Sequence, residues 1–289
     1  MPSIAIHRPL TVDEVVSLLA KEPGSRCIAG GQTLVANNNA GLVDTPSLIA
    51  VEGLSELRSI QQLTDGSVRI GAGVSHRDVA SRRFDGAHRV ISEAASVIAH
   101  PAIRNFGTIG GSLAHGDPAS DYPAAAVAVK GLIEIAGASG RRTVRASEFF
   151  LDYLTTALEP GEMITALVLP PAAAGSRGHY LKFSRVDGDY AILSIGVTLG
   201  RRDGICSDAS ISAGGMAATP IWSEKANAAL CNTNCDDTAI ALAARHILAV
   251  ADPVDDVRAS GEYRRALLPK LLRRAIRYVL GEKREAGCE

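Results

Sequence analysis

The sequence predicts an α+β protein built in two unequal parts that divide near residue 175. Short apolar segments alternate with helix-like segments through the first part. A stretch rich in Pro, Ala and Gly over 170–178 is the best candidate for a linker. Beyond it, three strand-like segments precede three helix-like ones, and this change of pattern indicates a second domain.

The elements of the first part are predicted from caps, chain breaks and periodicity. Thr11-Val12-Asp13-Glu14 has the form of a capping box, and the helix that it starts should end before Pro23-Gly24. Strands are expected at 27–29, 46–51 and 68–73. Further helices are expected from His76, over 90–99 and after Asp121-Tyr122-Pro123, where a proline suits the first helical position.

The second part is predicted to begin with strands near 180–185, 191–199 and 205–213. Three helices should close the chain, from Thr219-Pro220, over about 236–250 and after Ser260. Pro269 is expected to kink or interrupt the last of them.

The composition is that of an ordinary globular protein. Of 289 residues, 46% are hydrophobic and 21% charged, and the formal net charge is -1. Lys and Arg are scattered and aromatic residues make up only 4%, so we expect neither nucleic-acid binding nor attachment to an anionic membrane. The most apolar window, 124–138, is interrupted by Lys130 and Glu134 and is too short to span a bilayer.

Cysteine usage favours a cytoplasmic protein. Residues 1–4 have no signal-peptide character, and five cysteines at irregular spacing do not form a disulfide framework. Cys231 and Cys235 could belong to a metal site, but packed free thiols are the simpler interpretation and no metal is expected. The clustered cysteines are too few to hold an iron–sulfur cluster.

Two separated glycine pairs are the most informative feature. They lie in Ala29-Gly30-Gly31-Gln32-Thr33-Leu34 and in Arg104-Asn105-Phe106-Gly107-Thr108-Ile109-Gly110-Gly111-Ser112. Glycine pairs let backbone N–H groups point into one concave site without a Cβ in the way, and such nests bind phosphate oxygens. Two nests from distant parts of the chain could clamp a pyrophosphate from both sides. Thr33, Thr108 and Ser112 would add hydroxyl groups.

Neither pair fits the dinucleotide fingerprint or the phosphate loop that ends in Gly-Lys-Ser. In this order and at this separation, the two motifs instead resemble those of the molybdenum hydroxylase (xanthine dehydrogenase and carbon monoxide dehydrogenase) flavoprotein family. The match is nearest to medium subunits of the carbon monoxide dehydrogenase type and covers essentially the whole chain. It includes Phe149-Phe150-Leu151-Asp152-Tyr153, Glu159-Pro160-Gly161-Glu162, Gly188-Asp189-Tyr190-Ala191 and Glu262-Tyr263-Arg264-Arg265.

The resemblance implies an FAD-binding domain of the PCMH type, as in vanillyl-alcohol oxidase-like flavoproteins, over residues 1–175. Its two subdomains would cover about 1–55 and 56–175. Residues 176–289 would form a domain like the C-terminal one of carbon monoxide dehydrogenase flavoproteins, an antiparallel sheet with a helix bundle. The border falls in the predicted linker.

The resemblance also implies which residues bind FAD. The diphosphate and adenosine would contact Ile28, Ala29, Gly30, Gly31, Gln32, Thr33 and Leu34, with Thr108, Gly110, Gly111 and Ser112 as the opposite wall. Asp121, expected in a loop at the cofactor and outside the core, would meet sugar or ribityl hydroxyls. Lys182 and Tyr190 would lie near the isoalloxazine, although Tyr190 could instead be a core strand residue with a hydrogen-bonded hydroxyl. Ala114 and Leu158 complete the implied set.

Other polar residues leave alternatives open. His115 could reach the flavin or a partner, or be solvated, and Asp117 with Asp121 could form an acid–base pair in place of loop and cofactor contacts. His7, His76, His88, His100, His179 and His246 are interpreted as surface or capping residues. Two departures count against a close assignment to carbon monoxide dehydrogenase itself: residues 35–41 lack the basic residue that family members usually carry, and Ala50 stands where they usually have Asp.

The resemblance implies an oxidoreductase subunit with FAD and no catalytic residue of its own. A molybdenum cofactor-binding large subunit would oxidise the substrate, and a [2Fe-2S] small subunit would pass electrons to FAD and on to NAD, a quinone or oxygen. The assembly would be a dimer of heterotrimers, with residues 103–106 as part of the docking surface. A standalone FAD-dependent oxidoreductase with the same fold is the alternative, and a flavin-free scaffold is a third.

Overall fold

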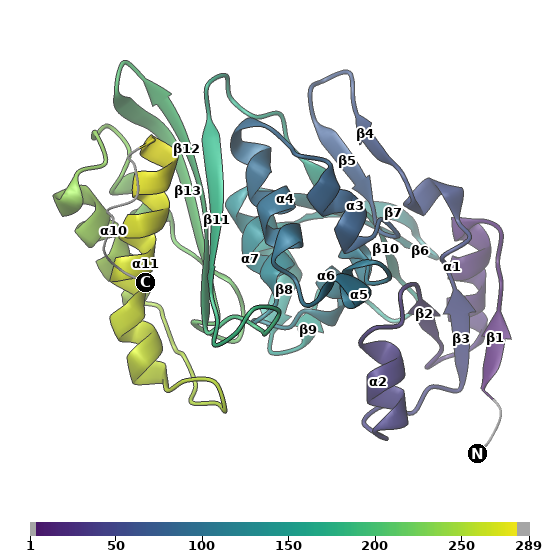
Figure 1. Ribbon diagram of the computed structural model, residues 1–289. Coiled ribbons are helices and arrows are strands. Elements are labelled where there is room, and N and C mark those ends of the chain that lie inside the picture. The colour runs from purple at the N-terminus through teal and green to yellow at the C-terminus, as the bar shows by residue number, and fades with distance from the viewer. Residues whose placement is uncertain (1–3, 282–289) are drawn as a thin grey trace.

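The computed structural model describes residues 4–281, whose strands and helices form successive layers (Figure 1). A small three-stranded sheet comes first and a five-stranded sheet follows. Helices separate the five-stranded sheet from a four-stranded one, and the C-terminal helices cover the far face of the latter. The predicted α+β class is confirmed.

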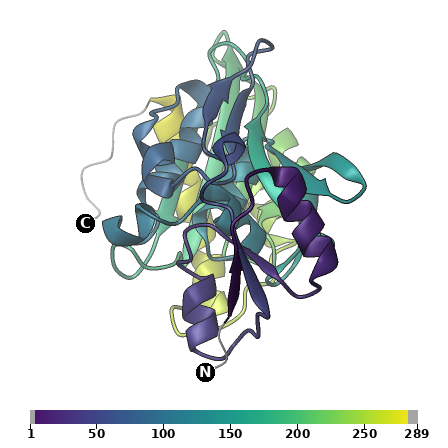
Figure 2. The same cartoon turned by 90° about the vertical axis from the view of Figure 1, so that its right-hand side faces the viewer.

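The small sheet is parallel, with the strand order β1-β3-β2. The elements are β1 (Ala5–His7), α1 (Val12–Lys21), β2 (Arg26–Ile28), α2 (Leu34–Asn39) and β3 (Ser47–Ala50). One half of the predicted capping box is confirmed, because the Thr11 hydroxyl accepts from the N–H of Glu14. The Glu14 carboxylate accepts from the N–H of Leu10, one residue before the N-cap. The sequence did not predict α2, since its asparagines have low helix propensity. Figure 2 turns this sheet and α1 toward the viewer.

The second sheet is antiparallel, with the order β4-β5-β10-β6-β7. Its strands are β4 (Ile60–Gln62), β5 (Val68–Gly71), β6 (Leu132–Gly137), β7 (Gly140–Arg145) and β10 (Met163–Leu169). A separate hairpin pairs β8 (Phe150–Asp152) with β9 (Thr155–Thr156). Of these strands only β5 was predicted individually. β6 was not predicted because its apolar residues continue those of the preceding helix, and the hydrophobic pattern alone does not show where the helix ends and the strand begins.

Short helices connect the strands of the second sheet. They are η1 (Ser55–Leu57), α3 (His76–Ser81), η2 (Gly86–His88), α4 (Arg89–Ser96), α5 (Pro101–Arg104), α6 (Ile109–His115), α7 (Asp121–Ala128) and α8 (Ala146–Phe149). The predicted helix from His76 is confirmed as α3. The helix predicted over 90–99 is α4, which ends earlier, at Ser96, and the helix predicted after Asp121-Tyr122-Pro123 is α7, which already begins at Asp121. α7 is buried on every side, which its small residues allow: a Cβ on Gly196 of the adjacent sheet would stand 2.7 Å from the Ala128 Cβ.

The C-terminal sheet is antiparallel, with the order β11-β12-β13-β14. The elements are β11 (Arg177–Phe183), β12 (Leu193–Arg202), β13 (Ile205–Gly214), β14 (Ile221–Trp222), α9 (Glu224–Ala228), α10 (Asp237–Leu248) and α11 (Gly261–Leu280). The three predicted strands and the last two helices are confirmed. The expected helix start at Thr219-Pro220 is wrong, because β14 comes first and the Ser223 hydroxyl caps α9. Pro269 does not interrupt α11.

Residues 4–281 form two hydrophobic cores. The first gathers side chains from Val12 to Leu169, together with Tyr180 of β11, and the second gathers side chains from Leu193 to Val279. Residues 170–176, between β10 and β11, contain no helix or strand. Among the helices of residues 4–281, none combines the length and the apolar character that crossing a bilayer requires.

Candidate functional site

The first glycine turn connects β2 to α2 and exposes a run of backbone donors. Within residues 4–281, the N–H groups of Gly30 to Leu34 have no hydrogen-bond partner. Gly31 has φ +68°, a left-handed conformation that glycine adopts without strain. Thr33 stands at the N-cap of α2, and its hydroxyl does not cap that helix. Five consecutive free donors are what an oxygen-rich anion such as a diphosphate needs.

The two glycine segments lie against one another although they are far apart in the sequence. A Cβ on Gly30 would stand 1.9 Å from the carbonyl oxygen of Phe106 and 2.9 Å from the Cα of Gly107. Only a glycine permits this approach of two backbones. The Gln32 side chain donates to the carbonyl oxygen of Gly30 at 3.1 Å, and Ile28 and Ala29 lead into the turn half-buried.

The second glycine pair is not a nest of free donors, and that part of the prediction is wrong. Gly110 and Gly111 stand in the first turn of α6. The N–H of Gly110 donates to the carbonyl oxygen of Ala72 at 2.9 Å, and that of Gly111 to the Thr108 hydroxyl at 3.2 Å. A Cβ on Gly110 would lie 2.4 Å from the Ala72 Cβ, so this glycine lets α6 approach the end of β5.

Several residues of α6 are at least partly exposed and can contact a ligand. Gly111 and Ala114 are exposed, and Ser112 is half-buried. His115 is half-buried in the last turn of α6. The neighbouring β9 leads to the half-buried Leu158, whose N–H donates to the Thr156 hydroxyl at 3.4 Å. α6 therefore runs from the Gly107 loop to the hairpin of β8 and β9, which Leu158 follows in the chain.

Asp121 and Lys182 form a buried ion pair across the border of the two parts. Lys182 Nζ lies 3.0 Å from the Asp121 carboxylate and also donates to the carbonyl oxygen of Val97 at 3.1 Å. The Tyr180 hydroxyl donates to the other oxygen of Asp121 at 2.8 Å. Burial raises the pKa of Asp121 to about 6, against the opposing effects of Lys182 and Tyr180.

The expectation that Asp121 lies outside the core is therefore wrong. The residue is only 4% exposed in the first turn of α7, a helix whose residues are all buried. The sequence did not predict the role of Tyr180, because a single tyrosine in a strand does not indicate a partner that lies 59 positions away in the sequence, as Asp121 does.

Tyr190 stands in the loop between β11 and β12, not in a strand. Its side chain is 38% exposed, so the alternative of a core strand residue is wrong. The N–H of the next residue, Ala191, donates to the carbonyl oxygen of Ala119 at 3.2 Å, and this joins the loop to the segment before α7. Burial raises the pKa of Tyr190, and the nearby Asp117 carboxylate adds to this effect.

His76 and Tyr122 form a buried aromatic pair behind the second glycine segment, with ring centroids 5.3 Å apart. The interpretation of His76 and His88 as surface residues is wrong, since both are buried. His88 stands at the N-cap of α4, but its side chain makes no capping hydrogen bond. Burial lowers the pKa of His76 to about 4, and Arg104 adds a smaller electrostatic effect. A Cβ on Gly107 would lie 2.6 Å from His76 Nε2, so the imidazole supports the loop that contacts Gly30.

No metal centre is assembled among residues 4–281, where no three His, Cys, Asp or Glu side chains are gathered as ligands. Cys206 and Cys235 are buried free thiols of the second core, and Cys231 packs partly buried against it. Cys288 lies outside the described residues.

Comparisons with known proteins identify the two parts. The model for the FAD binding domain in molybdopterin dehydrogenase matches residues 2–172, and that for the CO dehydrogenase flavoprotein C-terminal domain matches residues 178–279. The carbon monoxide dehydrogenase medium chain of Afipia carboxidovorans is 34% identical, over 95% of this chain and 96% of its own. The nicotine 6-hydroxylase medium subunit of Paenarthrobacter nicotinovorans is 31% identical, over 96% and 97%.

A solved structure of carbon monoxide dehydrogenase from Hydrogenophaga pseudoflava is similar over 98% of this chain and 99% of its own, with a TM-score of 0.93 and 32% identity. Quinoline 2-oxidoreductase from Pseudomonas putida 86 gives a TM-score of 0.88 at 28% identity. The resemblance noted from the sequence is thereby confirmed. The chain belongs to the molybdopterin dehydrogenase flavoprotein family, combines its FAD-binding domain with the CO dehydrogenase flavoprotein C-terminal domain, and has FAD as its cofactor.

Proposed function

We propose that this chain is the electron-transfer subunit of a molybdenum hydroxylase-type complex. It would receive electrons from the [2Fe-2S] clusters of a partner subunit and pass them through FAD to an acceptor such as NAD, a quinone or oxygen. Bound FAD supplies the redox chemistry, and the protein supplies binding, orientation and electrostatics. The observation that carries the proposal is the run of free N–H groups from Gly30 to Leu34, held against the Phe106–Gly107 backbone.

Each part of the site has a proposed task. The free donors of the first turn, with the Thr33 hydroxyl, would bind the diphosphate. Ser112 and the exposed face of α6 would form the opposite wall. Asp121 would reach a sugar or ribityl hydroxyl only by sharing the carboxylate that binds Tyr180 and Lys182. Tyr190 and Lys182 would lie near the isoalloxazine, with Lys182 acting through the buried pair.

The proposed partners follow from the relatives and from the composition. Relatives are named medium chains or subunits of carbon monoxide dehydrogenase and nicotine 6-hydroxylase. This chain has five cysteines, too few clustered together for two [2Fe-2S] clusters. We therefore assign the clusters to a small subunit and the molybdenum cofactor to a large one, in a dimer of heterotrimers. Residues 1–175 and 176–289 would act as the two domains of this subunit.

Replacing Gly30 tests the binding site. Gly30→Ala places a methyl group 1.9 Å from the Phe106 oxygen, so the two segments must separate. Losing two charge-assisted hydrogen bonds at about 1.5 kcal/mol each should weaken FAD binding by roughly 100-fold. Gly53→Ala is the matched control, because nothing lies within 4 Å of a Cβ there. Titration of the apoprotein should show the loss only in Gly30→Ala, and equal affinities in both variants would reject the site.

Rapid mixing tests the electron route. Within residues 4–281 no three His, Cys, Asp or Glu side chains gather as metal ligands for substrate oxidation. The isolated flavoprotein should therefore remain oxidised with candidate organic substrates and become reduced when mixed with a reduced [2Fe-2S] partner. Rapid reduction by an organic substrate alone would instead favour a standalone flavoenzyme.

A further inference from the structure

The loop over 249–260, between α10 and α11, is tied firmly to the start of α11. The Asp256 carboxylate accepts from the N–H groups of Arg258 and Ala259, at 2.8 and 3.0 Å. It also lies 2.7 Å from the guanidinium of Arg264, a residue that is only 3% exposed. These contacts fix the backbone that carries the Arg258 side chain.

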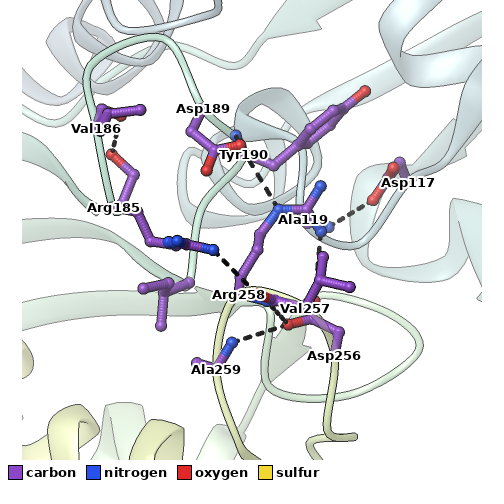
Figure 3. A network of polar contacts seen from close by, with 12 residues as sticks. Asp117, Ala119, Arg185, Val186, Asp189, Tyr190, Asp256, Val257, Arg258 and Ala259 are labelled. Atoms are coloured by element: carbon purple, nitrogen blue, oxygen red, sulfur yellow. Dashed lines mark hydrogen bonds and ion pairs between the residues drawn. The ribbon is translucent and has the colours of Figure 1, made fainter.

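Arg258 reaches from this loop to Tyr190. Its guanidinium carbon lies 5.0 Å from the centre of the Tyr190 ring, within the range of a cation–π contact. Its Nε lies 3.7 Å from Asp189, which in turn accepts from the N–H of Tyr190 at 2.8 Å. Figure 3 shows Arg258 between the Asp189–Tyr190 loop and the segment with Asp117 and Ala119. The guanidinium thus occupies one face of the ring.

A second arginine joins the same two loops without touching the ring. Arg185 donates to the carbonyl oxygen of Val257 at 3.1 Å (Figure 3). The loops are therefore held together independently of Arg258, and Arg185 separates loop tethering from the ring contact in an experiment.

We infer that Arg258 is a positioning residue for the flavin: it holds the Tyr190 ring in place, so that the free face of the ring covers the isoalloxazine. The inference rests on the proposed function, which puts Tyr190 beside the flavin. A guanidinium remains charged at every relevant pH, so it would also place a fixed positive charge behind the ring. That charge favours the reduced, more negative flavin, and removing it should lower the reduction potential.

The test compares Arg258→Met, Arg258→Lys and the control Arg185→Met in the purified full chain. FAD titration of each apoprotein comes first and should give one FAD per chain in all three. Arg258→Met should then show brighter emission of the bound flavin, approaching that of Tyr190→Leu, because a loosely held ring quenches less. At a fixed ambient potential the ratio of reduced to oxidised flavin should fall by roughly two- to five-fold. Arg258→Lys should recover part of both changes, and Arg185→Met should match the parent.

A readout without FAD makes the inference independent of binding. Burial raises the pKa of Tyr190 and the Arg258 guanidinium opposes this rise, so Arg258→Met should raise the pKa of this phenol further in the apoprotein. NMR of ring-labelled tyrosine follows the titration, and Tyr190→Phe assigns the signal. Unchanged flavin emission and phenol pKa in Arg258→Met would overturn the inference and leave the proposed function standing. Failure of the parent chain to bind FAD would count against both.

Discussion

Burial of His76 should make the stability of this protein depend on pH in a defined direction. The imidazole lies behind the loop that meets the first glycine turn, packed on Tyr122, and burial lowers its pKa from 6.5 to about 4. Between pH 6.5 and about 4, His76 is therefore protonated in the unfolded chain and neutral in the folded one. This contribution to stability is complete above pH 6.5 and is lost as the pH falls toward 4.

The size of the effect follows from the pKa difference. At about 1.4 kcal/mol per pKa unit, a fall from 6.5 to about 4 corresponds to about 3 kcal/mol of unfolding free energy. That is a large share of the roughly 5–15 kcal/mol that stabilises a typical domain. The positive charge of Arg104 acts in the same direction, because it also disfavours protonation of the ring.

Chemical denaturation at several pH values between 4 and 7.5 measures the effect. His76→Leu cannot bind the proton, so its unfolding free energy should lose about 3 kcal/mol less than that of the parent over this range. Tyr122→Phe is the control: it removes a buried hydroxyl that has no partner but leaves His76 buried, so the parent's slope should persist. Parallel curves for the parent and His76→Leu, or an NMR titration of His76 near 6.5, would refute the reasoning.

Three further changes test other parts of the molecule. Burial raises the pKa of Asp121 to about 6, so relative to Asp121→Asn the parent should lose stability in denaturant as the pH rises from 3.8 to about 6, and a constant difference would contradict this. Gly110→Ala should lower the melting temperature because its methyl group meets Ala72, whereas Gly53→Ala, where nothing lies within 4 Å of a Cβ, should not, and equal melting curves would rule the clash out. Arg264→Met should cost about 3–5 kcal/mol because a buried arginine leaves its acceptors unpaired, and a loss below about 1 kcal/mol in denaturation would show that these acceptors find water.

Local signals in the sequence predicted those elements that depend on local physics. The capping box at Thr11 starts α1, and the predicted helix over about 236–250 is α10, capped by the Asp236 carboxylate. Such caps satisfy backbone donors within a single turn, so three or four residues are enough to recognise them. The strand β6 gives a weaker signal, because on one side it pairs with β10, which comes later in the chain, and only on the other with its neighbour β7.

The sequence did not predict the contacts of the site that join segments far apart in the chain. Asp121 was expected at a cofactor loop, but Tyr180 and Lys182 reach it from the other part of the chain and hold it in the core. Arg258 gave no signal at all, since its contact with Tyr190 depends on how the loop before α11 folds back. Contacts of this kind depend on the packing of whole layers, and no residue pattern within one segment encodes them.

The two glycine pairs also differ in ways that the sequence does not show. Gly30 and Gly110 both precede a second glycine and look equivalent in the sequence, yet different neighbours exclude a Cβ from each: the Phe106 carbonyl oxygen from Gly30, and the Ala72 side chain from Gly110. The turn after Gly30 keeps its N–H groups free for a ligand, whereas the N–H groups of the second pair are used inside the protein. A glycine pair therefore indicates that backbones come close, and only the partner of each N–H tells whether the approach serves a ligand or the fold.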